Sequence, residues 1–280
     1  MLVKFQDEFV LLDGLLVNLN DDDAAPSITK HKNIYRIEDV YANVKSDERI
    51  IFITRHADRV SYDTTITGDL TNTGINQCIR LGQALHNPNI NLSNTYIGGS
   101  HKYRAKNTAY QVTKAMGVVY PDQYNYLTDT DEFDLLMEIN FFVDDDGDSK
   151  GISLDRNAYY SFVDDTIYNG TNKVDDHVTT KSKELFDFLI NTAANHNADL
   201  CWFGTHDKVI LPLLAYVTDR TQPLHIERDN SDVYVKMTNP ITKAETGKWS
   251  IPLLSGIAVI VNKTSGAVDM YPVESTPFIT

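Results

Sequence analysis

Short apolar runs alternate along this chain with stretches of helical periodicity, and this alternation constrains the fold more than any other feature. The first run, Arg49-Ile-Ile-Phe-Ile-Thr54, is rich in β-branched residues and is typical of a strand buried on both faces. Strands are also expected at residues 96–99, 200–204 and 256–261, with 267–271 pairing with the last as a hairpin. Helices are expected after Thr71, from about 105 to 116, from Ser182 to Asn195, and from about 208 to 217. The pattern predicts an α/β fold: a three-layer α/β/α sandwich with a mostly parallel central sheet.

The polar stretches that interrupt this alternation indicate the domain organisation. Residues 1–48 are interpreted as an N-terminal extension that wraps the domain, and residues 49–280 as a single α/β domain. Within that domain, residues from about 140 to 181 are interpreted as a small insertion that caps the site. A chain of 280 residues can bury a sizeable core without a disulfide or a metal. Cys78 and Cys201 each sit in an apolar pattern and are expected to be buried thiols.

The chain is strongly acidic. It has 25 lysine and arginine residues against 39 aspartate and glutamate residues, so the formal net charge is −14. Nucleic acids and anionic membrane surfaces require a basic face, so neither is expected as a partner. No run of about 18 apolar residues occurs, and residues 1–19 lack the basic start and uninterrupted apolar stretch of a signal peptide. We expect a cytoplasmic protein, or an exported one whose leader is not part of this sequence, and no oligomeric state is indicated.

Arginines and histidines follow three of the expected strands. Arg55 and His56 come directly after the first strand, Arg104 follows the second, and His206 follows the third. Ligands of open α/β sheets bind beyond the carboxyl ends of the strands, so these side chains are expected to lie along one rim.

This set of side chains suits phosphoryl transfer. Arginine forks match phosphate oxygens bidentately, a histidine held by its neighbours can attack phosphorus, and a further carboxyl group would protonate the leaving alkoxide. No His-x-x-x-His or cysteine-pair spacing occurs, so neither a metal nor another cofactor is expected.

Four short motifs in order resemble those of the histidine phosphatase superfamily, which includes phosphoglycerate mutase-like and acid phosphatase-like enzymes. Arg55-His56 resembles the Arg-His-Gly motif of that family. The other three are Leu70-Thr-Asn-Thr-Gly74-Ile-Asn-Gln77 with Leu81-Gly82, Ser100-His-Lys-Tyr-Arg104-Ala-Lys-Asn-Thr108-Ala109, and Gly204-Thr-His206-Asp207. The resemblance covers about residues 48 to 217 and implies a phosphoglycerate mutase-like fold.

The resemblance also implies a role for each matching residue. His56 would be the phosphorylated nucleophile, and Arg55, Arg104 and His206 would bind the phosphoryl oxygens. Arg59 completes an "RHxxR" pattern that resembles the acid phosphatase branch, and it would add a further phosphate contact. Ala57 stands where the family has glycine, and an alanine there would be strained if the position needed a positive φ.

The proton donor has two candidates, because the family has two branches. Glu138, in Leu135-Leu-Met-Glu-Ile, resembles the glutamate of one branch, and Asp207, directly after His206, resembles the aspartate of the other. The fuller local pattern favours Glu138. Asp207 also fits a purely structural role as a helix N-cap.

The leading hypothesis is therefore a metal-independent phosphatase that hydrolyses small phosphomonoesters through a phosphohistidine on His56. A phosphoglycerate mutase-like phosphotransferase is an alternative within the same enzyme family. A catalytically silent phosphate-binding module is an alternative of a different class, and Ala57 is its only support.

Overall fold

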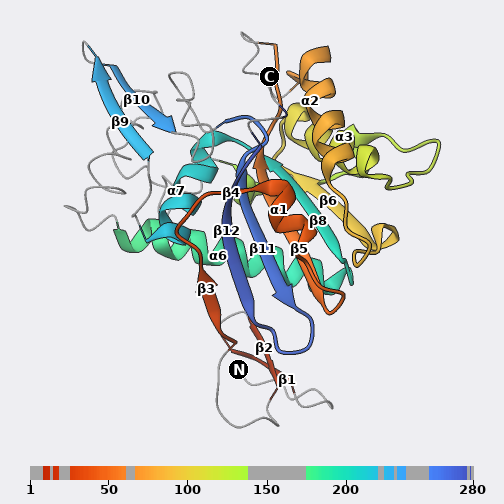
Figure 1. The fold of residues 1–280 in the computed structure, drawn as a ribbon, viewed down its shortest axis with the longest axis vertical. Helices are drawn as coiled ribbons and strands as arrows, with labels where there is room; N and C mark the ends of the chain where they lie inside the picture. The colour runs from red at the N-terminus through yellow and green to blue at the C-terminus, as the bar shows by residue number, and fades with distance from the viewer. Residues whose placement is uncertain are drawn as a thin grey trace.

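The computed structural model describes residues 26–60, 67–137, 175–219, 252–275 and 278, with the secondary structure alone for residues 9–12, 15–18, 175–178, 224–229 and 232–237. Its centre is a mixed sheet with the strand order β3-β12-β11-β5-β8-β6-β7, and β4 also pairs with β12 (Figure 1). The strands are β3 (Ile28–Lys30), β4 (Tyr35–Arg36), β5 (Glu48–Arg55), β6 (Thr95–Gly99), β7 (Asp131–Glu132), β8 (Leu200–Thr205), β11 (Gly256–Asn262) and β12 (Val268–Glu274).

Most strand pairs in this sheet are parallel. β5, β8, β6 and β7 run in the same direction, β11 lies antiparallel to β5, and β12 lies antiparallel to β11. The predicted α/β fold and its mostly parallel sheet are therefore confirmed. Each of the five expected strands is present within one to three residues of its predicted ends.

Helices cover both faces of the sheet. α1 (Ile37–Ala42), α2 (Asn72–Ala84) and α3 (Tyr103–Met116) pack on one face, and α6 (Asp175–Asn195) and α7 (Asp207–Thr218) pack on the other (Figure 1). The side chains of β5 pack on both faces of the sheet. Ile50 and Phe52 belong to the core under α1, α2 and α3, and Ile51 and Ile53 belong to the core under α6 and α7. Successive side chains of a strand point to opposite faces, so an unbroken apolar run produces two cores.

Part of the predicted N-terminal extension belongs to the sheet. β3 is its edge strand and runs parallel to β12, while β4 pairs with the other end of β12 and leads directly into α1. Ile37, Val40 and Tyr41 of α1 are buried in the same core as α2 and α3. The extension therefore contributes to the domain core. We still propose the boundary after residue 48, with residues 1–48 as the N-terminal extension and 49–280 as the α/β domain.

The remaining elements are short or lie apart from the central sheet. Two antiparallel hairpins, β1 (Phe9–Leu12) with β2 (Leu15–Asn18) and β9 (Leu224–Asp229) with β10 (Asp232–Met237), were not expected from the sequence. The short helices are η1 (Leu92–Asn94), α4 (Tyr126–Asp129) and η2 (Asp134–Leu136). None of the described helices is long and apolar enough to cross a membrane.

The predicted cap insertion, residues 140–181, lies largely outside the described residues. Its last residues belong to α6, which begins at Asp175 rather than at the expected Ser182. Residues 175–181 contain few apolar side chains, so the periodicity that predicts a helix starts only further along the chain.

Candidate active site

The register of three parallel strands brings the predicted rim residues together. Thr54 of β5 pairs with Gly204 of β8, which pairs in turn with Gly99 of β6. The residues that follow these positions therefore leave the sheet at nearly the same height. Backbone hydrogen bonds continue past the strands, from the His56 amide to the Thr205 carbonyl at 3.0 Å and from the Ser100 amide to the Gly204 carbonyl at 3.0 Å.

His56 and His206 lie side by side at this edge. Their ring centroids are 5.3 Å apart with the rings nearly perpendicular, and each residue is only 4% exposed. The His56 Nδ1 lies 2.7 Å from the Ala57 carbonyl oxygen. A carbonyl can only accept, so Nδ1 carries the proton and donates it. In the neutral ring this leaves the lone pair on Nε2, which is the atom available for attack on phosphorus.

Positive groups surround the His56 ring. Burial lowers the pKa of His56 well below its ordinary value of 6.5, and electrostatic interactions with His206, Arg55 and Arg104 lower it further, against the opposing hydrogen bond to Ala57. The imidazole is therefore neutral at physiological pH. A neutral imidazole keeps its lone pair and can act as a nucleophile.

His206 lies among the same cations. Burial is the largest cause that lowers its pKa well below 6.5, followed by the charges of Arg104, Lys102, Arg55 and Arg59. The structure thus places all three arginines predicted at the phosphate site around the two histidines. Arg104 is 6% exposed, while Arg55 and Arg59 are half-buried. A cluster of buried and half-buried cations on an acidic chain favours an anionic ligand.

Thr108 joins the loop after β5 to the first turns of α3. Its Oγ1 accepts a hydrogen bond from the Ala57 amide at 3.0 Å and donates one to the Arg104 carbonyl at 2.8 Å. This side chain fixes the nucleophile loop and the helix that carries Arg104 relative to each other. Ala57 itself has no positive φ and is fully buried, so the strain considered for an alanine at this position is not present.

The same loop is held from its other side by α2. The Gln77 side chain accepts from the Asp58 amide at 3.0 Å, and Thr71, the N-cap of the helix, donates to the Asp58 carboxylate at 2.7 Å. A Cβ on Gly74 would lie 2.1 Å from the Asp58 carbonyl oxygen. The helix can approach this loop so closely only because residue 74 is glycine.

A second close approach places α3 on β8. A Cβ on Gly204 would lie 2.0 Å from the Ala105 carbonyl oxygen. The glycine therefore lets the turn that carries Arg104 rest against the strand that carries His206.

Asp207 is the first residue of α7, and His206 takes the N-cap position that the sequence assigned to Asp207 as its structural role. The Asp207 carboxylate accepts a hydrogen bond from the Lys208 amide at 3.0 Å. His206 Nε2 lies 3.3 Å from the Ser100 hydroxyl. Asp207 is thus next to the site in the chain, and its described contact is to the helix backbone.

Glu138, the other candidate proton donor, lies outside the described residues. The chain just before it lies against the site, since the Leu136 carbonyl accepts a hydrogen bond from Thr205 Oγ1 at 2.7 Å. His101 also ties this segment to the rim: Nδ1 lies 2.7 Å from the Glu132 carboxylate and Nε2 lies 2.6 Å from the Asp134 carboxylate. The described segment that ends at Met137 therefore lies beside the candidate active site.

Sequence reasoning missed two groups at this site. Lys102 is one of the cations around His206, and only its place between Ser100 and Arg104 could have drawn attention to it. Leu254 donates its amide to the Arg55 carbonyl at 3.1 Å from a left-handed backbone with φ 61°. No local pattern marks such a leucine, because the conformation is set by the tertiary contact.

The described residues contain no group of three or more histidine, cysteine, aspartate or glutamate side chains that could hold a metal ion.

No protein-family model matches the sequence, and no curated protein sequence matches it. Among solved structures, the fold is similar to phosphoglycerate mutase from Bacillus anthracis str. Sterne, with 13% identity and a TM-score of 0.47 over 85% of this chain and 97% of that chain. It is also similar to YhfR of Bacillus stearothermophilus (18% identity, TM-score 0.39, 67% of this chain and 95% of that chain). A third similar structure is a mutant phosphoserine phosphatase from Entamoeba histolytica in complex with phosphoserine (14% identity, TM-score 0.33, 72% of this chain and 95% of that chain).

Proposed function

We propose that this protein is a phosphomonoesterase that works through a phosphohistidine on His56. The observation that carries the proposal is an oriented, neutral imidazole inside a cluster of cations. The hydrogen bond from Nδ1 to the Ala57 carbonyl leaves the lone pair on Nε2. Arg55 and Arg104 lie close enough to lower the pKa of the same ring by their charge. The substrate class is a small phosphomonoester, because arginine guanidinium groups match the oxygens of a phosphoryl group in charge and geometry.

The proposed reaction has two displacements at phosphorus. In the first, the Nε2 lone pair forms a nitrogen–phosphorus bond, the phosphorus–oxygen ester bond breaks, and the leaving alkoxide takes a proton from a carboxylic acid. In the second, that carboxylate takes a proton from water, the water oxygen bonds to phosphorus, and the electron pair of the nitrogen–phosphorus bond returns to Nε2. Arg55, Arg59, Arg104 and Lys102 stabilise the charge that develops on the phosphoryl oxygens.

Glu138 is the proton donor that we propose, with Asp207 as the alternative. The chain enters the segment that holds Glu138 beside Thr205 and His206. The Asp207 carboxylate accepts from the Lys208 amide, a contact that suits an ionised group in the first turn of a helix. Replacing a general acid costs about 10²- to 10⁴-fold in turnover. Glu138→Gln is therefore expected to lose that much for a substrate with a poor leaving group, and Asp207→Asn much less.

The test of the activity is phosphate release from a panel of phosphomonoesters in the presence of a chelator. We expect the wild type to turn over at least one aryl phosphate and His56→Ala to fall to the background of the assay. His86→Ala replaces an exposed histidine at the end of α2 and is the matched control, with activity unchanged. Circular dichroism and thermal unfolding of each variant show whether the fold is kept.

Two results would overturn the proposal. Full turnover in a folded His56→Ala variant would show that His56 is not the nucleophile. Binding of inorganic phosphate by the wild type with no release from any ester would favour a silent phosphate-binding module instead.

A further inference from the structure

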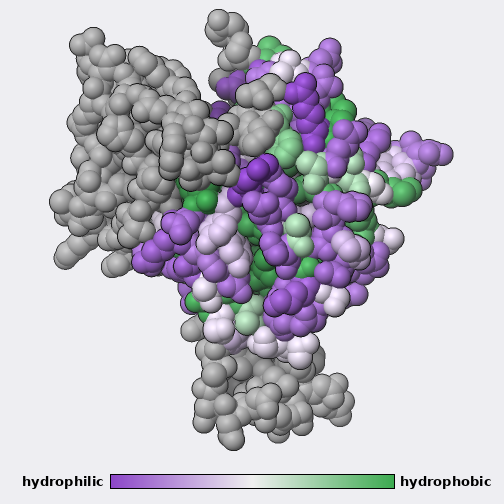
Figure 2. Space-filling view, in the orientation of Figure 1, coloured by the Kyte–Doolittle hydropathy of each residue, from purple (hydrophilic) through white to green (hydrophobic). Residues whose placement is uncertain are grey.

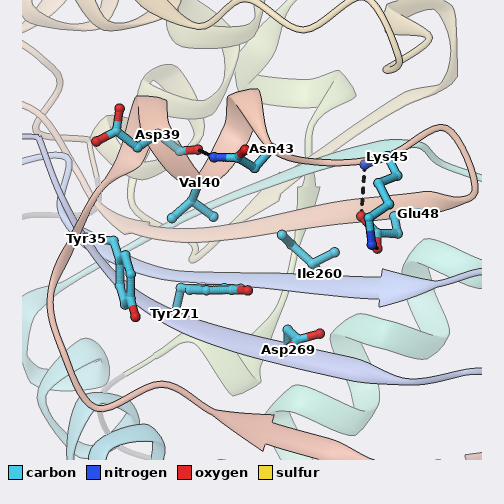
Figure 3. Close-up of a pocket in the computed structure, with 9 residues that line it drawn as sticks. All are labelled: Tyr35, Asp39, Val40, Asn43, Lys45, Glu48, Ile260, Asp269 and Tyr271. Carbon is cyan, nitrogen blue, oxygen red and sulfur yellow. Dashed lines mark hydrogen bonds and ion pairs between the residues drawn. The ribbon is translucent and has the colours of Figure 1, made fainter.

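A cavity of about 290 Å³ lies far from the candidate active site, between α1 and the strands β11 and β12. It is lined by Tyr35, Asp39, Val40, Asn43, Lys45, Glu48, Ile260, Asp269 and Tyr271 (Figure 3). Glu48 begins β5 and Arg55 ends it. At about 3.3 Å per residue, the two ends of this strand are roughly 23 Å apart. We call this cavity the α1 pocket.

An aromatic cluster forms one side of the α1 pocket. The Tyr271 ring is stacked on His31 with centroids 4.0 Å apart and an angle of 9°, and Tyr35 stands edge-on to Tyr271 at 5.3 Å. Figure 3 shows the Tyr271 ring reaching beneath Val40 toward Ile260. His31 covers one face of the Tyr271 ring and so holds the ring in place at the wall of the cavity. A fixed aromatic surface of this kind attracts cations through its electron-rich face.

The charged groups around the α1 pocket are mainly carboxylates. Asp39, Glu48 and Asp269 line it, and Lys45 is the single cation among the lining residues. Lys45 Nζ already pairs with Glu48 Oε1 at 3.2 Å. Asp269 is oriented by a contact of 3.1 Å from its Oδ1 to His31 Nε2, and its side chain is 40% exposed. An anion placed here would meet more negative than positive charge.

The α1 pocket differs from a metal site in its remaining walls. Val40 and Ile260 are apolar, and Tyr35 and Tyr271 present rings. Hard divalent cations require several oxygen ligands at close range, and the described residues hold no group of three ligating side chains. Apolar and aromatic walls with a carboxylate at the rim suit instead an organic cation. In Figure 2, hydrophobic surface also shows between hydrophilic side chains over the strands below α1.

We propose that the α1 pocket binds a small organic cation, an amine or guanidine carried on a short apolar or aromatic body. The cationic group lies against the Tyr271 ring and Asp269, and the apolar body contacts Val40 and Ile260. The cavity volume is at the lower limit of ligand pockets, about 300 Å³, so the ligand is small. This site is separate from the proposed phosphatase site and does not depend on it.

Three probes of the same shape and different charge test the proposal: phenethylamine, 2-phenylethanol and 3-phenylpropionate. Isothermal titration calorimetry on the full chain is expected to show binding of the amine only. Tyr271→Leu is expected to weaken amine binding by about twofold to thirtyfold, the range of a cation–π contact converted to affinity. Asp269→Asn, which removes the carboxylate charge, is expected to weaken amine binding as well. Tyr271→Phe keeps the ring and is expected to retain binding, which separates loss of the aromatic face from loss of fold.

Two controls locate the binding. Asp122→Asn replaces an exposed carboxylate beyond α3, and His56→Ala alters the candidate active site, and both are expected to bind the amine as the wild type does. No amine binding by the wild type, or equal binding of all three probes, would overturn the proposal. Amine binding that survives both Asp269→Asn and Tyr271→Leu, or that is lost in His56→Ala, would place the ligand elsewhere and would overturn it too.

Discussion

The two ends of β5 carry opposite chemistry. At the carboxyl end, Arg55 and His56 lie in a cluster of buried and half-buried cations where parallel strands end. At the amino end, Glu48 lines the α1 pocket, which is open, acidic and partly aromatic. The net charge of −14 has the sign of the amino end and not of the carboxyl end. Short-range contacts therefore select the charge of a ligand, since the field of the whole chain is screened within about 8 Å at physiological salt.

The two ends also differ in how tightly they are built. The Thr108 hydroxyl and two glycines fix the loop and helices around His56. The α1 pocket is bounded by the exposed Asn43 and Lys45 and by an edge of the sheet. The first arrangement suits chemistry that needs fixed atoms, and the second suits reversible binding.

The largest expected effect concerns the cation cluster. Arg104→Met is expected to lower kcat/KM for an aryl phosphate by about 10²- to 10³-fold, the cost of removing one preorganised donor. Amine binding at the α1 pocket is expected to be unchanged. Lys114→Met, which removes an exposed cation from the last turn of the same helix, is the matched control with normal kinetics. An equal loss of activity in both variants would show that general charge, and not the cluster, matters.

The next largest effect is a difference in stability between substitutions at the two ends of β5. Gly204→Ala is expected to destabilise the protein by about 3 kcal/mol, the upper part of the overpacking range, because the new methyl group would overlap the Ala105 carbonyl. Asn43→Ala, at the α1 pocket, removes one exposed hydrogen bond to the Asp39 carbonyl and is expected to cost less than about 1 kcal/mol. Urea unfolding measures both losses, and similar values would show that the two ends of β5 are packed equally tightly.

The histidines at the site predict the pH dependence of stability. The pKa values of His56 and His206 are lowered in the folded state, so the unfolded chain binds more protons below pH 6.5. Stability is then fully present above about pH 6.5 and decreases as the pH falls, by about 1.4 kcal/mol per pH unit for each imidazole. Unfolding followed from pH 8 to 5.5 in phosphate-free buffer checks the slope. His206→Gln is expected to reduce the slope of the unfolding free energy against pH by the contribution of one imidazole.

His101 is expected to change stability with pH in the direction opposite to His56 and His206, so it serves as a control. Its hydrogen bonds to Asp134 and Glu132 raise its pKa, so its contribution is present at low pH and is lost as the pH rises through the folded value. The pH window of this contribution lies between 6.5 and the raised pKa of the folded state. His101→Gln is expected to remove the decrease of stability with rising pH in that window and to leave the slope below pH 6.5 unchanged. A changed slope below pH 6.5 in this variant would contradict the assignment of its two ion pairs.

The smallest expected effect is on salt dependence. The acidic chain repels an anionic ester and attracts an organic cation at long range. Raising the ionic strength to about 0.15 M screens both effects. The kcat/KM for an aryl phosphate is therefore expected to rise slightly or stay constant, while amine affinity falls, each by less than about tenfold. A steep fall of kcat/KM with salt would indicate long-range steering and would remove this difference between the two ends.

Much of the fold could be predicted because its signals are local. The apolar run before Arg55 marks a buried strand, and Thr71 followed by spaced apolar residues marks α2, which it caps through the Gly74 amide at 3.0 Å. β3 and β4 could not be predicted, because they are too short to show a period and form only by pairing with β12. Glu138 and most of the proposed cap lie outside the described residues, so the choice of proton donor stays a prediction.

Local sequence is enough to identify the residues that leave the ends of the central strands: Arg55 and His56 after one, Arg104 and His206 after two others. The periodicity of strands and helices depends on residues that are close together in the sequence, so these positions can be predicted from the sequence. Only the tertiary structure decided that Nδ1 of His56 donates to Ala57, that Thr108 ties this loop to α3, and that an acidic pocket lies under α1. These features depend on the register and packing of segments far apart in the chain, where atoms must meet within hydrogen-bonding distance.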